Sequence, residues 1–143
     1  MDITYKPADN TDIEPLFQLS KALIDAYENR ETVDYEKVLS WVRHKLETNI
    51  QEYTCILLNE AKVGYYRFHD AAGKMEIDDL YVLPQYQNRG IGTQVLEKCI
   101  AETSLPIFLY VFANNRRAVA LYQKLGFRIT ENIKGSRYIM QRG

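Results

Sequence analysis

The sequence has only two cysteines, four prolines and no long apolar run. Cys55 and Cys99 are too few for a disulfide scaffold, and neither has the CxxC or Cys/His spacing of a structural zinc site. The apolar runs are short, such as residues 106–111, whereas a membrane-spanning helix needs about 20 apolar residues. The N-terminal residues lack the basic stretch and apolar run of a signal peptide. We therefore expect a soluble, cytoplasmic protein with no metal site and no membrane partner.

An excess of one charge is also lacking, since the formal net charge is -1. Proteins that bind nucleic acid usually show a strong basic excess, so we expect no nucleic-acid partner. The near-neutral total hides an asymmetry along the chain. Residues 1–37 carry nine acidic and four basic side chains, and residues 112–143 carry one acidic and seven basic side chains. This separation raises the question of two ligands of different charge.

The remaining composition is that of a globular domain. The chain has 143 residues, of which 46% are hydrophobic, and it contains neither repeats nor a linker-like tract. Because domains usually hold about 100–200 residues, we expect a single domain over residues 1–143. The apolar content is sufficient for a core and too high for a disordered chain.

The spacing of apolar residues predicts eleven elements in the order β-α-α-β-β-β-α-β-α-β-β. Capping residues mark several helix starts, namely Asp9 to Asp12, Asp34, and Asn114 or Asn115. The expected strands are residues 3–6, 53–58, 63–68, 75–83, 106–112, 127–130 and 137–140. The expected helices lie near residues 13–27, 34–48, 91–103 and 116–125. This order predicts an α/β (α+β) fold, with a mixed sheet and helices on its faces.

The segment Gln87-Asn88-Arg89-Gly90-Ile91-Gly92 joins a predicted strand to a predicted helix. Free backbone amides at a helix N-terminus bind anions, glycines let the backbone approach a ligand, and Arg89 adds a cation. The spacing is not that of a P-loop, and Val95 stands where a Rossmann motif requires its third glycine. From the two glycines alone, a plain strand-to-helix turn remains the favoured interpretation.

Residues 87–92 resemble the Gln/Arg-x-x-Gly-x-Gly/Ala signature of the GNAT superfamily of acetyl-CoA-dependent N-acetyltransferases. Residues 115–127 resemble its second signature, Asn-x-x-Ala-x-x-x-Tyr-x-x-x-Gly-Phe. With the agreeing element order, the resemblance covers the chain from about Ile3 to Met140. It implies a small, bacterial-type single-domain member with about seven strands and about four helices. It also implies an acyltransferase whose cosubstrate is acetyl-CoA.

The resemblance further implies which residues hold the coenzyme. The diphosphate would lie against the loop residues Gln87, Asn88, Arg89, Gly90, Ile91, Gly92 and Thr93. The pantetheine arm would lie along the backbone of Tyr81, Val82 and Leu83, on a strand that parts from its neighbour. Asn115 corresponds to an asparagine that contacts the pantetheine, although a plain helix N-cap explains it equally well. Lys124, Arg116 and Arg117 are placed either to meet coenzyme phosphates or on a solvated helix face.

Tyr122 corresponds to the tyrosine that protonates the departing thiolate, whereas without the resemblance core packing would explain it. A base must also remove a proton from the ammonium group of the substrate. Glu76 resembles the catalytic glutamate of histone-type members, and Asp78 and Asp79 resemble the acidic pair of polyamine-acetylating members. Strand alternation places Glu76 and Asp78 on one face and Asp79 on the other, unless a β-bulge intervenes. We expect Asp78 or Glu76 to be the base, although each could instead only bind the ammonium group.

The first two helices form the acceptor side in this family. Here they carry aromatic side chains together with Asp25, Glu28, Glu31, Asp34 and Glu36. This combination favours a small cationic primary amine, although a solvated acidic face explains it at least as well. His44 and His69 are expected to be surface or rim residues. Direct attack in a ternary complex is the expected mechanism. An acetyl-CoA-binding sensor without turnover and a protein N-acetyltransferase remain alternatives, and homodimerisation stays open.

Overall fold

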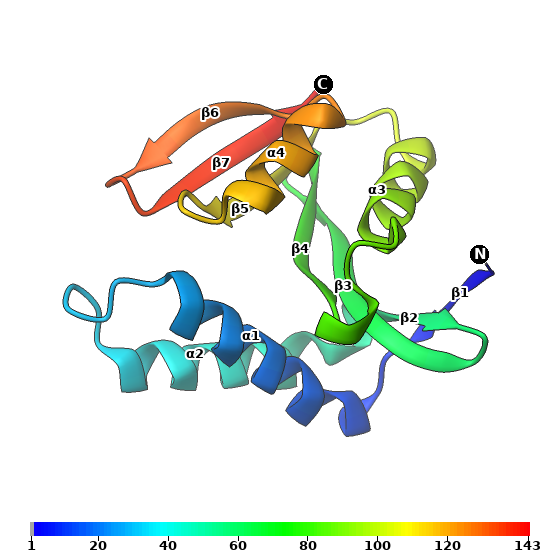
Figure 1. Ribbon diagram of the computed structural model, residues 1–143, viewed down its shortest axis with the longest axis horizontal. Helices are drawn as coiled ribbons and strands as arrows, with labels where there is room; N and C mark the ends of the chain where they lie inside the picture. Colours follow the sequence, from blue (N-terminus) through cyan, green and yellow to red (C-terminus); the bar gives the residue numbers. More distant parts are fainter. Residues whose placement is uncertain (1) are drawn as a thin grey trace.

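Seven strands form one mixed sheet in the computed structural model, which describes residues 2–143, and four α-helices cover its faces (Figure 1). The strands are β1 (Ile3–Pro7), β2 (Tyr53–Leu58), β3 (Ala61–Ala71), β4 (Lys74–Val82), β5 (Ile107–Phe112), β6 (Arg128–Ile133) and β7 (Arg137–Arg142). The helices are α1 (Ile13–Tyr27), α2 (Tyr35–Asn49), α3 (Ile91–Glu102) and α4 (Arg116–Lys124). The predicted order of strands and helices is confirmed, and within residues 2–143 no helix is long and apolar enough to cross a membrane.

Side-chain caps fix the starts of the helical segments where the sequence predicts them. Asp9 and Asp12 form a capping box before α1, and the Asp34 carboxylate accepts a hydrogen bond from the N–H of Lys37 in α2. The Asn115 side chain accepts a hydrogen bond from the N–H of Ala118 in α4. Each cap satisfies a backbone donor that the helix itself leaves free. The N-cap interpretation of Asn115 is therefore confirmed.

The sheet has the strand order β1-β2-β3-β4-β5-β7-β6, and its parallel pair is β4 with β5. Only two residue pairs join these strands, Met75 with Ile107 and Glu76 with Phe108. β4 continues for six more residues without pairing to β5, so the two strands part toward their C-terminal ends. The expected parting of the strand before the loop is present.

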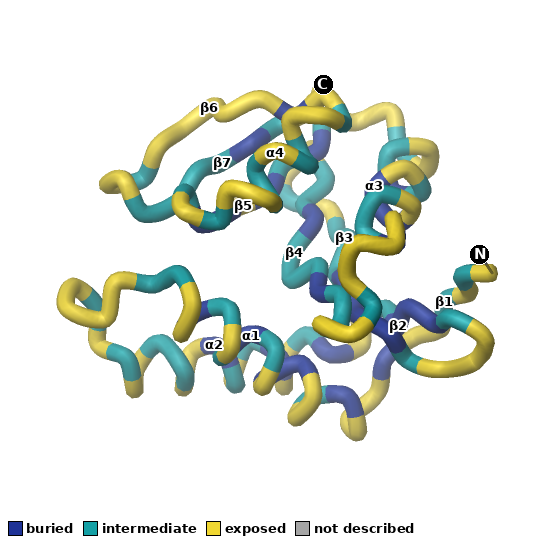
Figure 2. The backbone as a smooth tube through the Cα atoms, in the orientation of Figure 1, coloured by how far each residue is buried: buried dark blue, intermediate teal, exposed yellow. Residues whose placement is uncertain are grey.

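Each face of the sheet has its own apolar core. Helices α1 and α2 pack on one face through Leu16 and Leu46, in the same core as Tyr53 of β2. Helix α3 packs on the other face through Val95 and Leu96. Figure 2 shows the buried residues following the strands and the inner sides of the helices. The two layers leave the gap between β4 and β5 as the place where a ligand can reach the centre of the sheet.

Strict alternation along β4, which places Asp79 opposite Glu76 and Asp78 unless a bulge intervenes, does not hold. The pairing with β3 slips between Arg67, which pairs with Asp78, and Tyr65, which pairs with Tyr81. Two β4 residues, Asp79 and Leu80, thus lie opposite one β3 residue, and Asp79 has a φ of 52°. This β-bulge resets the alternation of side chains. Asp79 consequently faces α2, on the same side as Asp78, rather than the opposite side.

Candidate active site

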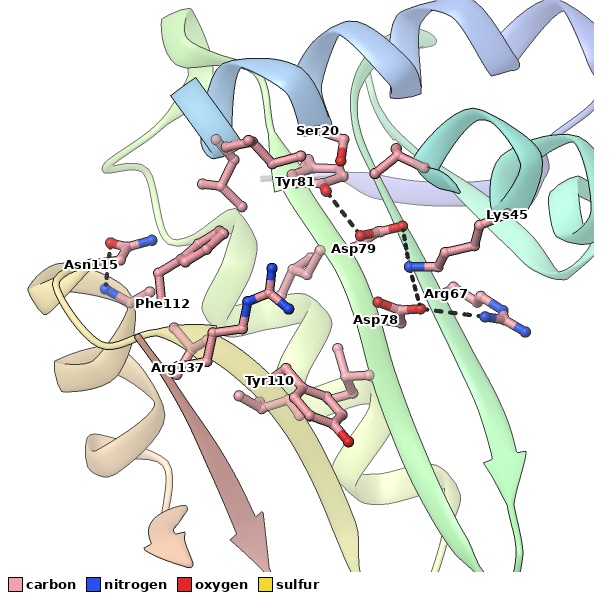
Figure 3. A pocket seen from close by; sticks show the side chains of 18 of the residues that line it. Ser20, Lys45, Arg67, Asp78, Asp79, Tyr81, Tyr110, Phe112, Asn115 and Arg137 are labelled. Carbon is pink, nitrogen blue, oxygen red and sulfur yellow. Dashed lines mark hydrogen bonds and ion pairs between the residues drawn. The ribbon is translucent and has the colours of Figure 1, made fainter. Parts of the chain in front are cut away.

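A pocket of about 830 Å³ lies between the parted strands and beneath α1 and α2 (Figure 3). Residues Glu76 to Tyr81 of β4 form one wall, and residues Leu109 to Phe112 of β5 form the other. Helix α4 contributes Asn115, Ala118 and Tyr122. The pocket therefore brings together candidate catalytic residues from β4 and from α4, which are more than 40 residues apart in the chain.

Two of the candidate carboxylates form a network with a lysine. The Lys45 ammonium lies 2.8 Å from an Asp78 carboxylate oxygen and 3.0 Å from an Asp79 oxygen. Burial alone would lower the pKa of Lys45, but the Asp79 and Asp78 carboxylates raise it. Arg67 lies 3.3 Å from Asp78. Lys45 and Arg67 therefore hold Asp78, and Lys45 holds Asp79.

Asp79 makes two further hydrogen bonds with buried tyrosines. The hydroxyl of Tyr53 donates to Asp79 at 2.6 Å, and the hydroxyl of Tyr81 donates to it at 2.9 Å. Burial, followed by the Asp79 carboxylate, raises the pKa of both tyrosines, so both remain protonated donors. With three donors on its two oxygens, Asp79 serves to fix the bulge of β4 against α2 and β2.

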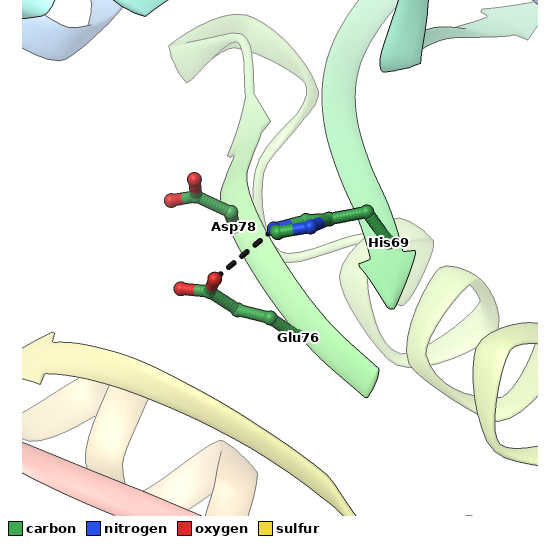
Figure 4. Close-up of side chains that lie close together, drawn as sticks. All are labelled: His69, Glu76 and Asp78. Carbon is green, nitrogen blue, oxygen red and sulfur yellow. Dashed lines mark hydrogen bonds and ion pairs between the residues drawn. The ribbon is translucent and has the colours of Figure 1, made fainter. Parts of the chain in front are cut away.

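Glu76 has a different environment. Its Oε1 lies 3.0 Å from Nε2 of His69 on the paired strand β3, and both side chains are less than one-fifth exposed (Figure 4). Burial and then the nearby Asp78 carboxylate raise the pKa of Glu76, while His69 opposes the rise. A raised pKa brings a carboxylate closer to the range that general-base chemistry needs. One potential metal-ligand atom from each of His69, Glu76 and Asp78 also lies within 4.8 Å of the other two.

Tyr122 lines the same pocket from α4. Its ring packs edge-on against Phe127, with 5.9 Å between the ring centroids. Burial raises the pKa of Tyr122 to about 12. The hydroxyl is therefore protonated at neutral pH and is a proton donor rather than a base.

The N-terminus of α3 is built differently from those of α2 and α4. Gly90 is its N-cap with a φ of 81°, and no side chain caps the helix. Within residues 2–143, no protein acceptor is recorded for the backbone N–H groups from Asn88 to Thr93. Uncapped amides at a helix N-terminus fit an anionic group such as a diphosphate. None of residues 87–93 lines the pocket described above.

Among the three residues expected to bind pantetheine, one turns its backbone N–H toward the gap between β4 and β5. Leu83 donates its N–H to the carbonyl of Val63 at 2.8 Å, and alternate residues of an antiparallel strand point their backbone groups to opposite sides. Tyr81 and Leu83 thus face β3, and Val82 faces the gap. The approach is close, because a Cβ on Gly64 would lie 2.2 Å from the Tyr81 carbonyl oxygen. Of the three residues expected to bind pantetheine, only Val82 has its N–H on the open side.

The acidic residues expected on the acceptor side do not line the pocket. Asp25 pairs with Lys21 and Arg30, and Glu28 pairs with Arg137. Asp34 caps α2, and Glu31 and Glu36 are exposed outside the pocket. These carboxylates therefore serve helix caps, ion pairs or solvent, as the alternative interpretation held. Lys124, Arg116 and Arg117 are exposed on α4.

Sequence reasoning missed several residues of the pocket. Lys45 and Arg67 were not singled out, because their partners lie on other strands and helices, up to 34 residues away. His69 was expected to be a rim residue, and its cross-strand pairing with Glu76 follows only from the β3–β4 register. Arg137 enters from β7 and carries no local motif. A hairpin register assigned from the turn at residues 72–73 would have indicated the pair of His69 and Glu76.

Comparison with known proteins shows the family and the fold of the chain. The sequence profile of the Acetyltransferase (GNAT) family matches residues 16–127. Thialysine N-epsilon-acetyltransferase of Mus musculus is 42% identical over 55 residues, which is 35% of this chain and 32% of that protein. Spermine/spermidine N(1)-acetyltransferase of Bacillus subtilis is 31% identical over 61 residues, 39% of this chain and 40% of that protein. The matched segment thus spans about a third of the length of these curated relatives.

The crystal structure of the PaiA N-acetyltransferase from Thermoplasma acidophilum in complex with coenzyme A has the same fold. Its TM-score is 0.73, with 23% identity over 99% of each chain. The chain belongs to the GNAT acetyltransferase family, so the predicted family and its α+β fold are confirmed. Acetyl-CoA is the cosubstrate of this family. The uncapped start of α3 and the parting of β4 from β5 fit such a ligand.

Proposed function

We propose that the protein is an N-acetyltransferase that moves the acetyl group of acetyl-CoA to the primary amine of a small molecule. Attack is direct, within a ternary complex, and residues 1–143 act as one domain. The observation that carries the proposal is the pocket itself, in which Glu76 on β4 and Tyr122 on α4 line the same cavity. A carboxylate of raised pKa and a protonated phenol are the base and the acid that acyl transfer to an amine requires.

The donor lies along the gap between β4 and β5. The free amides from Asn88 to Thr93 hold its diphosphate, and Arg89 adds a positive charge beside them. Gln87 supports the loop by donating from Nε2 to the Val82 carbonyl at 3.0 Å. The N–H of Val82 faces the gap and hydrogen-bonds the pantetheine arm or the thioester carbonyl. Asn115 and Lys124 contribute from α4, where Asn115 lines the pocket and Lys124 is exposed toward solvent.

Glu76 is the base we favour among the three carboxylates of β4. Asp79 accepts three hydrogen bonds, and Asp78 is held between Lys45 and Arg67, so protein donors already occupy the oxygens of both side chains. Glu76 has one side-chain partner, His69, and its pKa is raised by burial. It can therefore accept the proton that the ammonium group of the substrate must lose.

The chemical step then balances within the pocket. Glu76 takes one proton from the ammonium group and releases it to solvent. The neutral amine nitrogen then attacks the thioester carbonyl carbon, forming the C–N bond, and gives its second proton to Glu76. The C–S bond breaks with its electron pair on sulfur, and Tyr122 supplies the proton that yields the free thiol. The products are the N-acetyl amine and coenzyme A. Neither Cys55 nor Cys99 takes part, because both are buried and burial raises the pKa of each thiol.

The proposed acceptor is a small molecule, because helices α1 and α2 cover one side of the pocket (Figure 3). Two relatives support a small amine, since their names specify acetylation of thialysine and of spermine or spermidine. The reacting end of such an amine is cationic at neutral pH. The Glu76 carboxylate attracts this ammonium group before it removes the proton.

A panel of amines tests the proposal. The protein is incubated with acetyl-CoA and each amine, and thiol release is followed together with the mass of the acetylated product. We expect amine-dependent release well above the rate without amine. Tight binding of acetyl-CoA with no acetyl transfer to any amine would instead indicate a sensor. Transfer only to peptide amines would indicate a protein acetyltransferase.

A further inference from the structure

Four cationic and three acidic side chains line the pocket, which are Lys37, Lys45, Arg67, Arg137, Glu76, Asp78 and Asp79. Lys45 lies between Asp78 and Asp79, and Arg67 pairs with Asp78 and with Glu52 outside the pocket. These groups form one network of ion pairs. Three charged side chains lie outside it, which are Glu76, paired with His69, Arg137, paired with Glu28 outside the pocket, and Lys37.

Arg137 is held in position for a ligand. Its Nη2 lies 2.9 Å from Oε2 of Glu28, whose side chain is 5% exposed, while the Arg137 side chain is 42% exposed. The guanidinium carbon also lies 4.9 Å from the centre of the Phe112 ring, so the side chain is fixed from two sides. Figure 3 shows Arg137 extending from β7 into the pocket, across from Asp78 and Asp79 on β4. A guanidinium has five N–H donors, and the pair with Glu28 engages one nitrogen only.

Lys37 adds a second cation to the same pocket. It lies in the first turn of α2, it is exposed, and no acidic partner is recorded for it within residues 2–143. An exposed ammonium and a fixed guanidinium are the groups with which proteins bind a carboxylate or phosphate. The coenzyme does not account for them, because its diphosphate site at residues 88–93 lies outside this pocket.

We propose that Lys37 and Arg137 form an anion-binding subsite, and that the acceptor carries an anionic oxygen group, a carboxylate or a phosphate, in addition to its primary amine. This inference rests on the proposed function and narrows its substrate class. The anionic group binds at Lys37 and Arg137 while the amine points toward Glu76. The subsite holds one end of the acceptor and so orients its amine along the pocket. A simple polyamine has no anionic group to be held there, so its orientation would not be fixed.

Matched pairs of amines test the subsite directly. Lysine and cadaverine differ only by the carboxylate, as do ornithine and putrescine, and phosphoethanolamine and ethanolamine differ only by the phosphate. Binding of each to the protein loaded with coenzyme A is measured by calorimetry, and turnover with acetyl-CoA is measured alongside. We expect the anionic member of at least one pair to bind about tenfold or more tightly, since hydrogen bonds to charged groups contribute this much. Comparing the carboxylate pairs with the phosphate pair shows which anionic group the subsite binds.

Two variants connect that preference to these residues. Lys37→Gln should reduce it a few-fold, since exposed charges contribute modestly. The double variant Glu28→Gln/Arg137→Gln should abolish it without leaving a buried carboxylate unpaired. Lys6→Gln, on the exposed side of β1 and outside the pocket, is the matched control and should retain it. Any of three results would overturn the subsite. The two members of every pair could bind equally, no anionic amine could bind, or the preference for the anionic member could survive in both variants. Selective binding without turnover would support the subsite and contradict the proposed acetylation of that class.

Discussion

Nε2 of His69 faces Oε1 of Glu76 across the paired strands at 3.0 Å, while Nδ1 of the same ring lies 3.2 Å from the backbone carbonyl of Asp70. A carbonyl oxygen can only accept, so the contact with Asp70 favours a proton on Nδ1. The other ring nitrogen, Nε2, contacts Oε1 of Glu76, and His69 opposes the rise that burial causes in the pKa of Glu76. The ring thus affects the pH at which Glu76 can accept a proton.

Glu76→Gln should lower kcat by about 100-fold or more, because a positioned base contributes roughly 10²–10⁴-fold. Glutamine keeps the size of the side chain and a hydrogen bond to His69 but cannot take a proton. The base works only when ionised, so kcat/KM of the wild type should rise with pH through the raised pKa of Glu76. Steady-state kinetics across the pH range check both effects. Glu36→Gln, which alters an exposed carboxylate outside the pocket, is the control, and a Glu76 variant whose pH profile keeps this rise would exclude Glu76 as the base.

His69→Gln should displace the same pH profile without removing activity. His69 opposes the rise in the pKa of Glu76, so its loss raises that pKa further and the increase in kcat/KM moves to higher pH. At a pH well above the increase, kcat should stay within a few-fold of the wild type. His44→Gln on the exposed side of α2 is the matched control. An unmoved profile with a uniformly lower kcat would mean that His69 only supports the strand.

The difference between what was predicted and what the structure contains has a physical cause. The caps Asp34 and Asn115 and the glycine loop act over a few residues, so the sequence alone predicts them. The face on which Asp79 lies depends on one extra residue opposite Tyr66, and an aspartate with a φ of 52° carries no local mark of a bulge. Likewise, Glu28 and Arg137 are 109 residues apart, and only the completed sheet brings them together.

Lys45→Met should destabilise the fold by about 3 kcal/mol, because it leaves Asp78 and Asp79 facing each other without their cation. Adding Asp79→Asn should restore part of the loss. The folded-state pKa of Lys45 is raised, so its contribution is fully present at neutral pH and is lost only as pH rises through that value, above 10.5. Urea unfolding at neutral and alkaline pH measures the loss of stability and its dependence on pH. Equal unfolding midpoints for wild type and variant would show that the network adds no stability.

Two glycine substitutions should separate stability from coenzyme binding. Gly64→Ala puts a methyl group 2.2 Å from the Tyr81 carbonyl, so β3 and β4 must shift, at a cost of about 1–3 kcal/mol. Gly92→Ala meets Leu121 at an ordinary 3.8 Å inside α3, where alanine is the better helix former. It should leave the melting temperature unchanged or higher while weakening coenzyme A binding at the α3 start. Thermal melting and calorimetry with coenzyme A distinguish the two, and unaltered affinity in Gly92→Ala would argue against the diphosphate site.

Tyr122→Phe should lower kcat about 100-fold while keeping the fold and the affinity for coenzyme A, because the ring still packs against Phe127. The pKa of Tyr122 is raised to about 12, so the hydroxyl stays protonated from about pH 6 to about pH 10. The ratio of wild-type to variant kcat should therefore be constant over this range. An ordinary thiol has a pKa of about 8.5, below that of Tyr122, so proton transfer from Tyr122 to the thiolate is unfavourable by itself. Its coupling to the breaking of the C–S bond drives it, and solvent returns a proton to Tyr122 afterwards. If the ratio of wild-type to variant kcat fell to about one above about pH 9, the leaving thiolate would need no proton from Tyr122.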